Sequence, residues 1–258
     1  MAESDAATVV SRLRAAGCVF AEDEARLLIE AAGTPAELAE LVDRRVTGIP
    51  LEQILGWVDF CGLRLALDAG VFVPRRRTEF LVRCAVPLVP PGGVVVDLCC
   101  GCGALGAALA ARLRGIGLHA ADLDPAAVAC ARRNLARFGG QAYCGDLYAP
   151  LPASLRGGVD VLVANVPYVP TDAIALMPPE ARDHEPRIAL DGGRDGLDVA
   201  RRVITAAPDW LAPGGSLLFE TSESQADTAV ALLAGVGFVP RIDSDDELGA
   251  TVAIGTRR

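Results

Sequence analysis

Four consecutive residues, Asn165-Val166-Pro167-Tyr168, combine the residue types best suited to chemistry in this chain. They follow the apolar run Val159 to Ala164, a predicted strand, and are therefore expected at its carboxyl end, where open α/β sheets bind ligands. The Asn165 side-chain oxygen and the Val166 backbone carbonyl can accept the two hydrogens of a planar NH2 group, and Tyr168 can pack beside it. The tetrapeptide therefore predicts a binding site for the NH2 group of an amide or an exocyclic amine, groups that methyltransferases modify. This set of contacts from Asn165, Val166 and Tyr168 is called the grip below.

A glycine-rich turn upstream fits a second ligand. Val94 to Leu98 is predicted to be a strand, and Cys99, Gly101 and Gly103 follow it before a predicted helix. Glycine lets the backbone approach a ligand closely, and a helix N-terminus offers free N–H groups. Asp97 is expected to face the ligand, where a carboxylate suits a cationic amino-acid group better than a pyrophosphate. S-adenosylmethionine carries such an ammonium together with a sulfonium.

An acid ends the next predicted strand. Asp122, with Leu123 beside it, follows that strand, and a carboxylate there can accept both hydroxyls of a ribose. Asp124 precedes Pro125, which predicts that it is the N-cap of the following helix rather than a ligand. The sequence therefore assigns Asp122 and Leu123 to the cofactor site and Asp124 to local structure.

The third predicted strand also ends in an acid. Asp146 could accept a hydrogen bond from the amino group of adenine, with Leu147 against the ring. A purely structural alternative stays open, because an Asp after Gly145 often forms a turn. Three acids at three consecutive strand ends nevertheless predict one coherent cofactor site.

Strands and helices alternate through the second half of the chain, which predicts a mostly parallel sheet with helices on both faces. The expected strands are 94–98, 118–121, 141–144, 159–164 and 216–220. The expected helices are 104–113, 125–137, 197–207 and 224–234. The tail, 238–242 and 251–254, is predicted to close the sheet as an antiparallel pair.

The first half of the chain has a different pattern. Three short helical segments separated by glycines predict a small bundle over residues 1–49, and Thr34-Pro35-Ala36-Glu37 is typical of a capped helix start. Alternating residues over 57–67 predict a β-hairpin within a linker, 50–74. The third predicted domain, 75–258, begins with a helix that runs to about Val86.

Composition narrows the function classes. The 258 residues are 52% hydrophobic, and the net charge of −9 argues against tight, nonspecific binding of a nucleic-acid backbone. All 24 basic residues are Arg. Residues 1–7 lack the basic start of a signal peptide, and no apolar run is long enough for a membrane span, so a cytosolic protein is expected. Eight Cys, scattered except for Cys99, Cys100 and Cys102, and two His predict neither a disulfide framework nor a metal site.

The chain resembles the protein-(glutamine-N5) methyltransferases that modify peptide chain release factors. The resemblance rests on the segment 73–79, the turn 97–103, the acids described above, the tetrapeptide and the long segment His184 to Leu197. It implies a Rossmann-like class I methyltransferase domain after a helical domain and a hairpin linker, and it adds Thr78 to the cofactor site.

This chain departs from the family pattern at three places. Val166 stands where the family usually has Pro, Cys99 replaces the first glycine of the turn, and Arg76 and Arg77 replace a Pro and an acid. Val166 keeps its carbonyl, and Pro167 still restricts it to extended conformations, so a working grip is expected. The two arginines are expected to alter substrate choice.

The resemblance implies transfer of a methyl group to the side-chain amide of a glutamine, in a Gly-Gly-Gln motif of a release factor. One alternative is methylation of adenine or guanine amino groups in nucleic acid, although the acidic balance makes nucleic acid unlikely as a direct substrate. Another is a degenerate methyltransferase fold that only binds partners.

Overall fold

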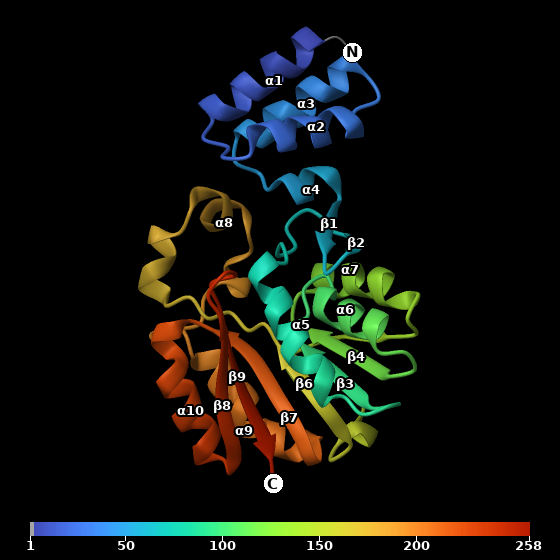
Figure 1. The fold of residues 1–258 in the computed structure, drawn as a ribbon, viewed down its shortest axis with the longest axis vertical. Helices are drawn as coiled ribbons and strands as arrows, with labels where there is room; N and C mark the ends of the chain where they lie inside the picture. Colours follow the sequence, from blue (N-terminus) through green and yellow to red (C-terminus); the bar gives the residue numbers. More distant parts are fainter. Residues whose placement is uncertain (1–2) are drawn as a thin grey trace.

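A seven-stranded sheet forms the centre of the computed structural model, which describes residues 3–258 and the side chains of residues 6–258 (Figure 1). Its strand order is β5-β4-β3-β6-β7-β9-β8. The strands are β3 (Val94–Leu98), β4 (Gly117–Asp122), β5 (Gln141–Cys144), β6 (Val159–Ala164), β7 (Leu211–Thr221), β8 (Phe238–Asp245) and β9 (Ala250–Arg257). The first five of these are parallel, and β9 is antiparallel to both of its neighbours. The predicted parallel sheet and its antiparallel tail are confirmed.

Helices cover both faces of this sheet, as the alternation predicted. One face carries α5 (Glu79–Ala85), α6 (Ala104–Arg112) and α7 (Pro125–Ala136), and the other carries α9 (Asp198–Trp210) and α10 (Ala226–Gly235). Successive side chains of a strand point to opposite faces, so Val95 joins the first hydrophobic core and Val96 the second. Both faces of β3 and β6 are therefore buried, which explains why these strands are almost uninterrupted apolar runs.

The chain passes from β3 to its neighbours in opposite directions. β4 lies on one side of β3 and β6 lies on the other. A crevice opens beyond the carboxyl ends of the strands where the order reverses in this way. The ends of β3, β4 and β6 therefore meet at one place, which positions residues from three distant parts of the chain.

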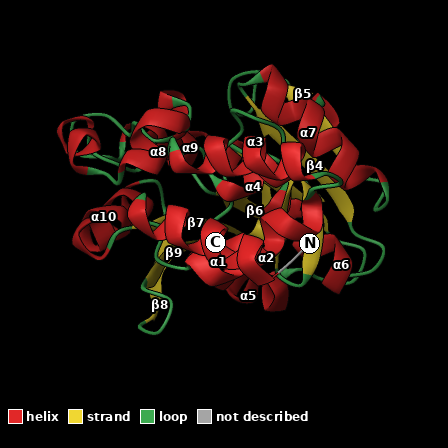
Figure 2. Cartoon of the chain, turned by 90° about the horizontal axis from the view of Figure 1, so that it is seen from above, coloured by secondary structure: helices red, strands yellow, loops and turns green. Residues whose placement is uncertain are grey.

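The N-terminal helices have a hydrophobic core of their own. They lie beyond one end of the sheet in Figure 1, and over it in the view from above in Figure 2. They are α1 (Glu3–Ala15), α2 (Ala21–Ala31) and α3 (Pro35–Val46), followed by α4 (Leu51–Leu55) and the hairpin β1 (Trp57–Phe60) and β2 (Leu63–Ala66). Thr34 caps α3 by accepting the Glu37 N–H at 3.2 Å, but the Glu37 carboxylate accepts the N–H of Gly33 rather than that of Thr34. The boundaries at residues 49 and 74 stay predictions.

The long segment between Val169 and Leu197 contains only short helices: η4 (Thr171–Leu176), α8 (Pro179–His184) and η5 (Arg187–Ala189). It contacts the N-terminal helices, because the Arg45 guanidinium lies 2.9 Å from the Glu180 carboxylate and His184 Nε2 lies 3.1 Å from the Thr47 carbonyl oxygen. This segment thus connects the helical part of the chain with the crevice.

Glu185 ties the same segment to the linker. One of its carboxylate oxygens accepts the Val73 N–H at 3.2 Å, and the other pairs with Arg75 at 2.5 Å. The Glu185 side chain is fully shielded from water. The sequence motif around it therefore has a structural reason, since a buried carboxylate needs both partners.

Within residues 3–258, no helix has both the length and the apolar composition needed to cross a lipid bilayer. Met1 and Ala2, at the start of the segment examined for a signal peptide, lie outside the described residues.

Arg45 joins the N-terminal helices to one another and to the long segment, so a substitution there tests these contacts. Its side chain is buried, it pairs with Glu24 at 2.6 Å and with Glu180, and it donates to the Ile49 carbonyl at 3.1 Å. Replacing Arg45 with Ala leaves the Glu24 carboxylate, whose side chain is only 12% exposed, without its cation, which is expected to reduce the free energy of unfolding by about 3 kcal/mol.

Urea unfolding of the full chain, followed by far-UV circular dichroism, measures this loss. Arg26→Ala is the matched control, because its i, i+4 pair with Glu30 is more than half exposed and is worth only about 0.5 kcal/mol. Equal losses in the two variants would contradict the role assigned to Arg45.

Candidate active site

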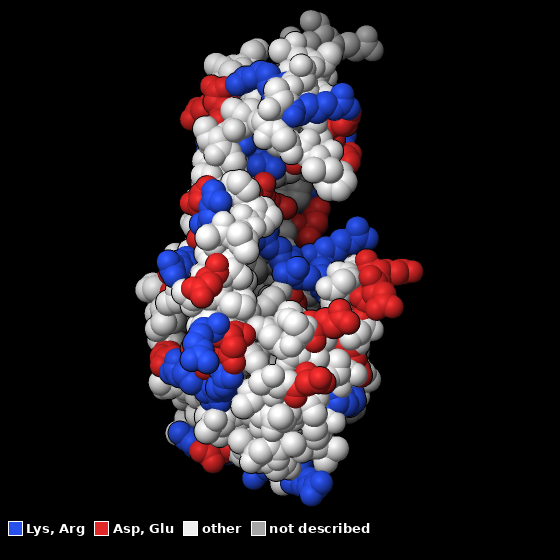
Figure 3. All heavy atoms as spheres, turned by 90° about the vertical axis from the view of Figure 1, so that its left-hand side faces the viewer, with Lys and Arg blue, Asp and Glu red and all other residues white. Residues whose placement is uncertain are grey.

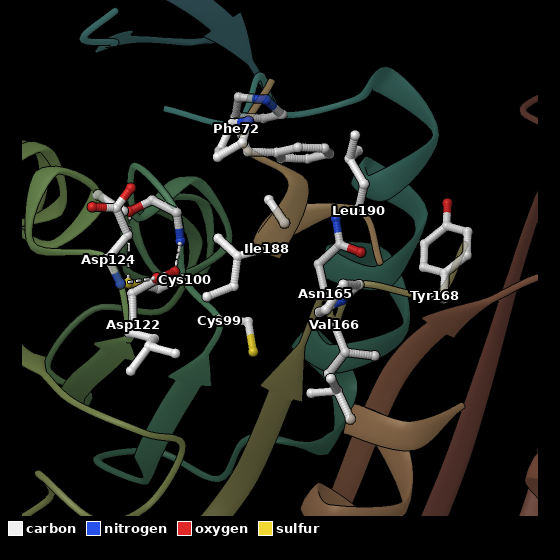
Figure 4. Close-up of a pocket in the computed structure, with 18 of the residues that line it drawn as sticks. Phe72, Cys99, Cys100, Asp122, Asp124, Asn165, Val166, Tyr168, Ile188 and Leu190 are labelled. Carbon is white, nitrogen blue, oxygen red and sulfur yellow. Dashed lines mark hydrogen bonds between the residues drawn. The ribbon is translucent and has the colours of Figure 1, made fainter. Parts of the chain in front are cut away.

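A cavity of about 580 Å³ lies beyond the carboxyl ends of β3, β4 and β6. Figure 4 shows Asp122 on one side of it, Asn165 and Tyr168 on the other, and Cys99 and Ile188 between them. The cavity lining is mainly apolar, with a few polar groups at its two ends, which is the usual make-up of a small-molecule site. The two predicted ends of the site, for cofactor and for acceptor, therefore share one space.

The glycine-rich turn forms the floor of the cofactor end. Cys99 and Gly101 line the cavity, with φ values of 53° and 54°. Only glycine adopts this left-handed region freely, so Cys99 holds a conformation that is unfavourable by about 1 to 2 kcal/mol for an L-residue. Burial raises the pKa of the Cys99 thiol far above its usual range, so it stays protonated.

Gly103 has a packing role instead of a lining role. Its φ is 79°, and a Cβ there would come within 3.2 Å of Ala131 on α7. Gly101, Gly103 and Gly106 together have the spacing of a dinucleotide-binding turn. The N–H of Gly106, however, is already taken by Asp97, at 2.9 Å.

The structure does not bring Asp97 into the cavity lining. Its side chain is completely buried, Oδ2 accepts the Gly106 N–H, and Oδ1 has no hydrogen-bond partner among the described residues. The reason is the alternation along β3, which points Asp97 to the same face as Val95, beneath α6. The prediction that Asp97 faces a cationic ligand group is therefore corrected. Burial raises the pKa of its carboxyl to about 7.

Asp122 is held at the cofactor end by two backbone groups. Oδ2 accepts the Gly101 N–H at 2.8 Å and Oδ1 accepts the Asp124 N–H at 2.9 Å. Each carboxylate oxygen keeps a second acceptor direction, so a diol can still bind. Burial raises the pKa of Asp122, while these backbone bonds oppose the rise. Asp124 caps α7 through the Ala126 N–H at 2.8 Å, as predicted.

Asp146 and Leu147 also line the cavity, and Leu147 has a left-handed φ of 48°. Asp146 forms an ion pair with Arg202 of α9 at 2.5 Å, and Arg202 itself lines the cavity. Arg202 was not predicted from the sequence, because no local spacing links a residue of α9 to the end of β5. Leu123 lines the cavity and is half exposed.

All four residues of the tetrapeptide line the acceptor end. Val166 is buried and Asn165 is half buried, with its Nδ2 atom 3.5 Å from Thr78 Oγ1. Thr78 lines the cavity, and its predicted contact with the cofactor stays a prediction. The Tyr168 hydroxyl donates to Glu220 at 2.8 Å and accepts from Arg77 at 2.5 Å. The tyrosine side chain is thus fixed at its hydroxyl. Glu220, like Arg202, was not predicted from the sequence.

The long segment forms a wall of the acceptor end. Ile188 and Leu190 line the cavity, and Figure 4 shows both near Asn165. A Cβ at Gly192 would stand 2.6 Å from the Pro167 carbonyl oxygen, so only glycine fits there. Gln225 joins the two segments by donating to the carbonyl oxygens of Tyr168 and Asp195. Glycine is therefore needed at position 192 because the backbone of the long segment touches the backbone of the tetrapeptide.

Charged side chains of both signs line the cavity. Four arginines line it, and each of them is paired with a carboxylate: Arg75, Arg77, Arg187 and Arg202. Four aspartates line it as well: Asp122, Asp124, Asp146 and Asp191. Figure 3 shows basic side chains gathered around the hollow below the N-terminal helices. Among residues 3–258, no group of three His, Cys, Asp or Glu side chains is arranged to hold a metal ion.

The buried carboxyl of Asp97 predicts a pH dependence of stability. Its folded-state pKa of about 7 lies above the usual value near 4, so the folded chain keeps a proton that the unfolded chain has lost. The stability that this group contributes is complete below about pH 4 and is lost as the pH rises through about 7. Asp97→Asn removes this titration, so its advantage over the unmodified chain should grow from pH 5 to pH 8.

Urea unfolding of both proteins at pH 5 and pH 8 gives this difference directly. A constant difference between them would show that Asp97 is ionised throughout the range.

Comparison with known proteins identifies the family. Residues 63–177 match the model of the methyltransferase small domain. The release factor glutamine methyltransferase of Geobacter sulfurreducens is 38% identical over 86% of this chain and 79% of its own length. That of Bradyrhizobium diazoefficiens is 34% identical over 99% of this chain and 94% of its own length.

Solved structures agree on the fold alone. A methyltransferase from Pyrococcus furiosus superposes with a TM-score of 0.56 at 16% identity, covering 76% of this chain and 89% of that one. A ribosomal protein L11 methylase from Lactobacillus delbrueckii gives a TM-score of 0.52 at 18% identity, covering 71% and 81%. With these relatives and this fold, the chain belongs to the family of release factor glutamine methyltransferases.

Proposed function

We propose that this chain transfers a methyl group from S-adenosylmethionine to the side-chain amide nitrogen of a glutamine in a protein, the Gly-Gly-Gln motif of a peptide chain release factor. One observation carries the proposal: Asn165 lies in the same cavity as Asp122, and its Oδ1 atom has no hydrogen-bond partner among the described residues. The names of the relatives support the choice of substrate.

The residues at the cofactor end fit S-adenosylmethionine. The Asp122 carboxylate is fixed by two N–H groups and can accept the ribose hydroxyls. Leu123 and Leu147 offer apolar contact to a purine, and Asp146 offers an acceptor for its amino group. The cofactor supplies a methyl carbon made electrophilic by the sulfonium. Cys99, Gly101 and the first residues of α6 would border its amino-acid part; neither Asp97 nor Gly103 borders the cavity.

The acceptor end can orient an amide for attack. An amide nitrogen is a weak nucleophile because its lone pair is delocalised. Two acceptors, Asn165 Oδ1 and the Val166 carbonyl, would hold its two hydrogens and stabilise the positive charge that develops on nitrogen. Tyr168 would border the amide, and Pro167 keeps the preceding backbone extended. Positioning then supplies much of the rate, and the proton leaves after the methyl transfer.

The protein substrate fits the surroundings of the cavity. We place a protein chain rather than a nucleic acid at the acceptor end, in line with the net charge of −9. Residues 1–49 are proposed as a separate helical domain that helps to hold this substrate, since they have their own core and contact the wall of the cavity. The cytosol, where translation occurs, is the proposed compartment.

Asn165→Ala tests the grip. It removes an acceptor that acts on the reacting amide, so turnover should fall by roughly a hundredfold or more. The affinity for S-adenosylmethionine should stay nearly unchanged, because Asn165 lies at the other end of the cavity. Methylation of a Gly-Gly-Gln peptide, followed by mass spectrometry, and titration calorimetry with the cofactor measure the two effects. Activity that survives the substitution would refute the grip.

Asp122→Ala tests the cofactor end. The loss of the ribose acceptor should weaken S-adenosylmethionine binding at least tenfold, or about 1.4 kcal/mol. Thr34→Ala is the matched control: it removes the N-cap of α3 and about 1 kcal/mol of stability, but should leave the affinity intact, because Thr34 does not line the cavity. Similar affinities in the two variants would contradict the role of Asp122.

The substrate class is tested by incubating the protein and labelled S-adenosylmethionine with a release factor, duplex DNA and ribosomal RNA. Label on the Gly-Gly-Gln glutamine alone supports the proposal. Label on a nucleobase would favour an amino-methyltransferase of nucleic acid, and the absence of cofactor binding would favour a degenerate binding module.

A further inference from the structure

Glu220 is a buried carboxylate at the end of β7, next to the acceptor end of the cavity. Its side chain is only 3% exposed. Oε1 accepts from Arg77 Nε at 3.0 Å and from the Tyr168 hydroxyl at 2.8 Å, while Oε2 accepts from Thr78 Oγ1 at 2.5 Å. An ionised carboxylate can only accept hydrogen bonds, so all three neighbours must donate to it.

This requirement fixes the direction of the next hydrogen bond. A threonine hydroxyl has a single proton, and that of Thr78 is directed at Glu220. Toward Asn165 the Thr78 oxygen can therefore offer only a lone pair. The Asn165 atom that faces it, at 3.5 Å, must be the NH2 group rather than the carbonyl oxygen.

From this arrangement we infer that Thr78 is a positioning residue: the chain Arg77–Glu220–Thr78 sets the orientation of the Asn165 carboxamide, so that Oδ1 is presented to the acceptor. The inference deepens the proposed function and rests on it for the role of Oδ1. Rotating the carboxamide by 180° would turn its NH2 group toward the NH2 group of the substrate. Two sets of donors would then face each other, and the grip would be lost.

Tyr168 belongs to the same chain of hydrogen bonds. Because its oxygen accepts from Arg77, its own proton is directed at Glu220. Burial raises the pKa of Tyr168 far above its usual value, which keeps this proton in place. Arg77 thus compensates the charge of Glu220 and sets the direction in which the tyrosine donates.

Glu220→Gln is the sharpest test, because it keeps the shape and changes only the pattern of donors. Arg77 and Tyr168 both donate to the Oε1 side, so the glutamine oxygen should settle there and its NH2 group should face Thr78. Thr78 must then accept from Gln and direct its proton at Asn165, which favours the flipped carboxamide. The expected result is a fall in kcat of at least about tenfold, with the cofactor Kd within about twofold.

Thr78→Val removes the same relay without changing the volume, and Thr78→Ser restores it. The valine variant should lose at least about tenfold in kcat, while the serine variant stays within about threefold of the unmodified protein. Combining Thr78→Val with Glu220→Gln should add no further loss, since both act through one hydroxyl. Thr205→Val is the matched control, because the hydroxyl of this exposed residue donates only to the Arg201 carbonyl.

A nuclear magnetic resonance measurement gives a readout that does not depend on activity. The side-chain NH2 signals of Asn165, assigned by their loss in Asn165→Ala, should shift in Thr78→Val and Glu220→Gln but not in Thr205→Val. Unshifted signals, or full kcat in Thr78→Val, would each overturn the inference. An unmodified protein that binds the cofactor but does not methylate the peptide would count against the proposed function alone, because the NH2 signals still report the orientation.

Discussion

The acceptor end depends on one buried charge, the carboxylate of Glu220. A carboxylate shielded from water is tolerated only when donors surround it, and here the donors come from two separate segments: Arg77 and Thr78 before α5, and Tyr168 after β6. The interaction that satisfies the charge therefore also joins these segments to β7. Asp122 has the corresponding role at the cofactor end, since its bond to the Gly101 N–H joins the end of β4 to the turn after β3.

Much of the fold could be predicted because the sheet is built from apolar strands with turn signals between them. The same rule located the site: in a parallel sheet the strand ends meet, so Asp122, Asp146 and Asn165 line one cavity. The direction of a single side chain did not follow from that rule. Asp97 sits at a strand end, yet the alternation along β3 turns it under α6.

Partners from distant parts of the chain could not be predicted. Arg202 reaches Asp146 from α9, and Glu220 reaches Thr78 from β7, and neither contact leaves a local spacing in the sequence. The unusual Arg77 indicated that this place differs from the family pattern, but only the fold shows that it faces a buried carboxylate. The need for glycine at Gly192 also became clear only from the fold, because the Pro167 carbonyl oxygen leaves no room for a Cβ there.

The ion pair between Arg45 and Glu180 has a mechanical consequence. It fastens the N-terminal helices to the wall of the cavity, and His184 adds a second attachment at Thr47. Moving the helices away from the sheet would pull on both contacts, and so on the segment that carries Ile188 and Leu190. The helical end of the molecule is thus part of the frame that keeps the reaction chamber in shape.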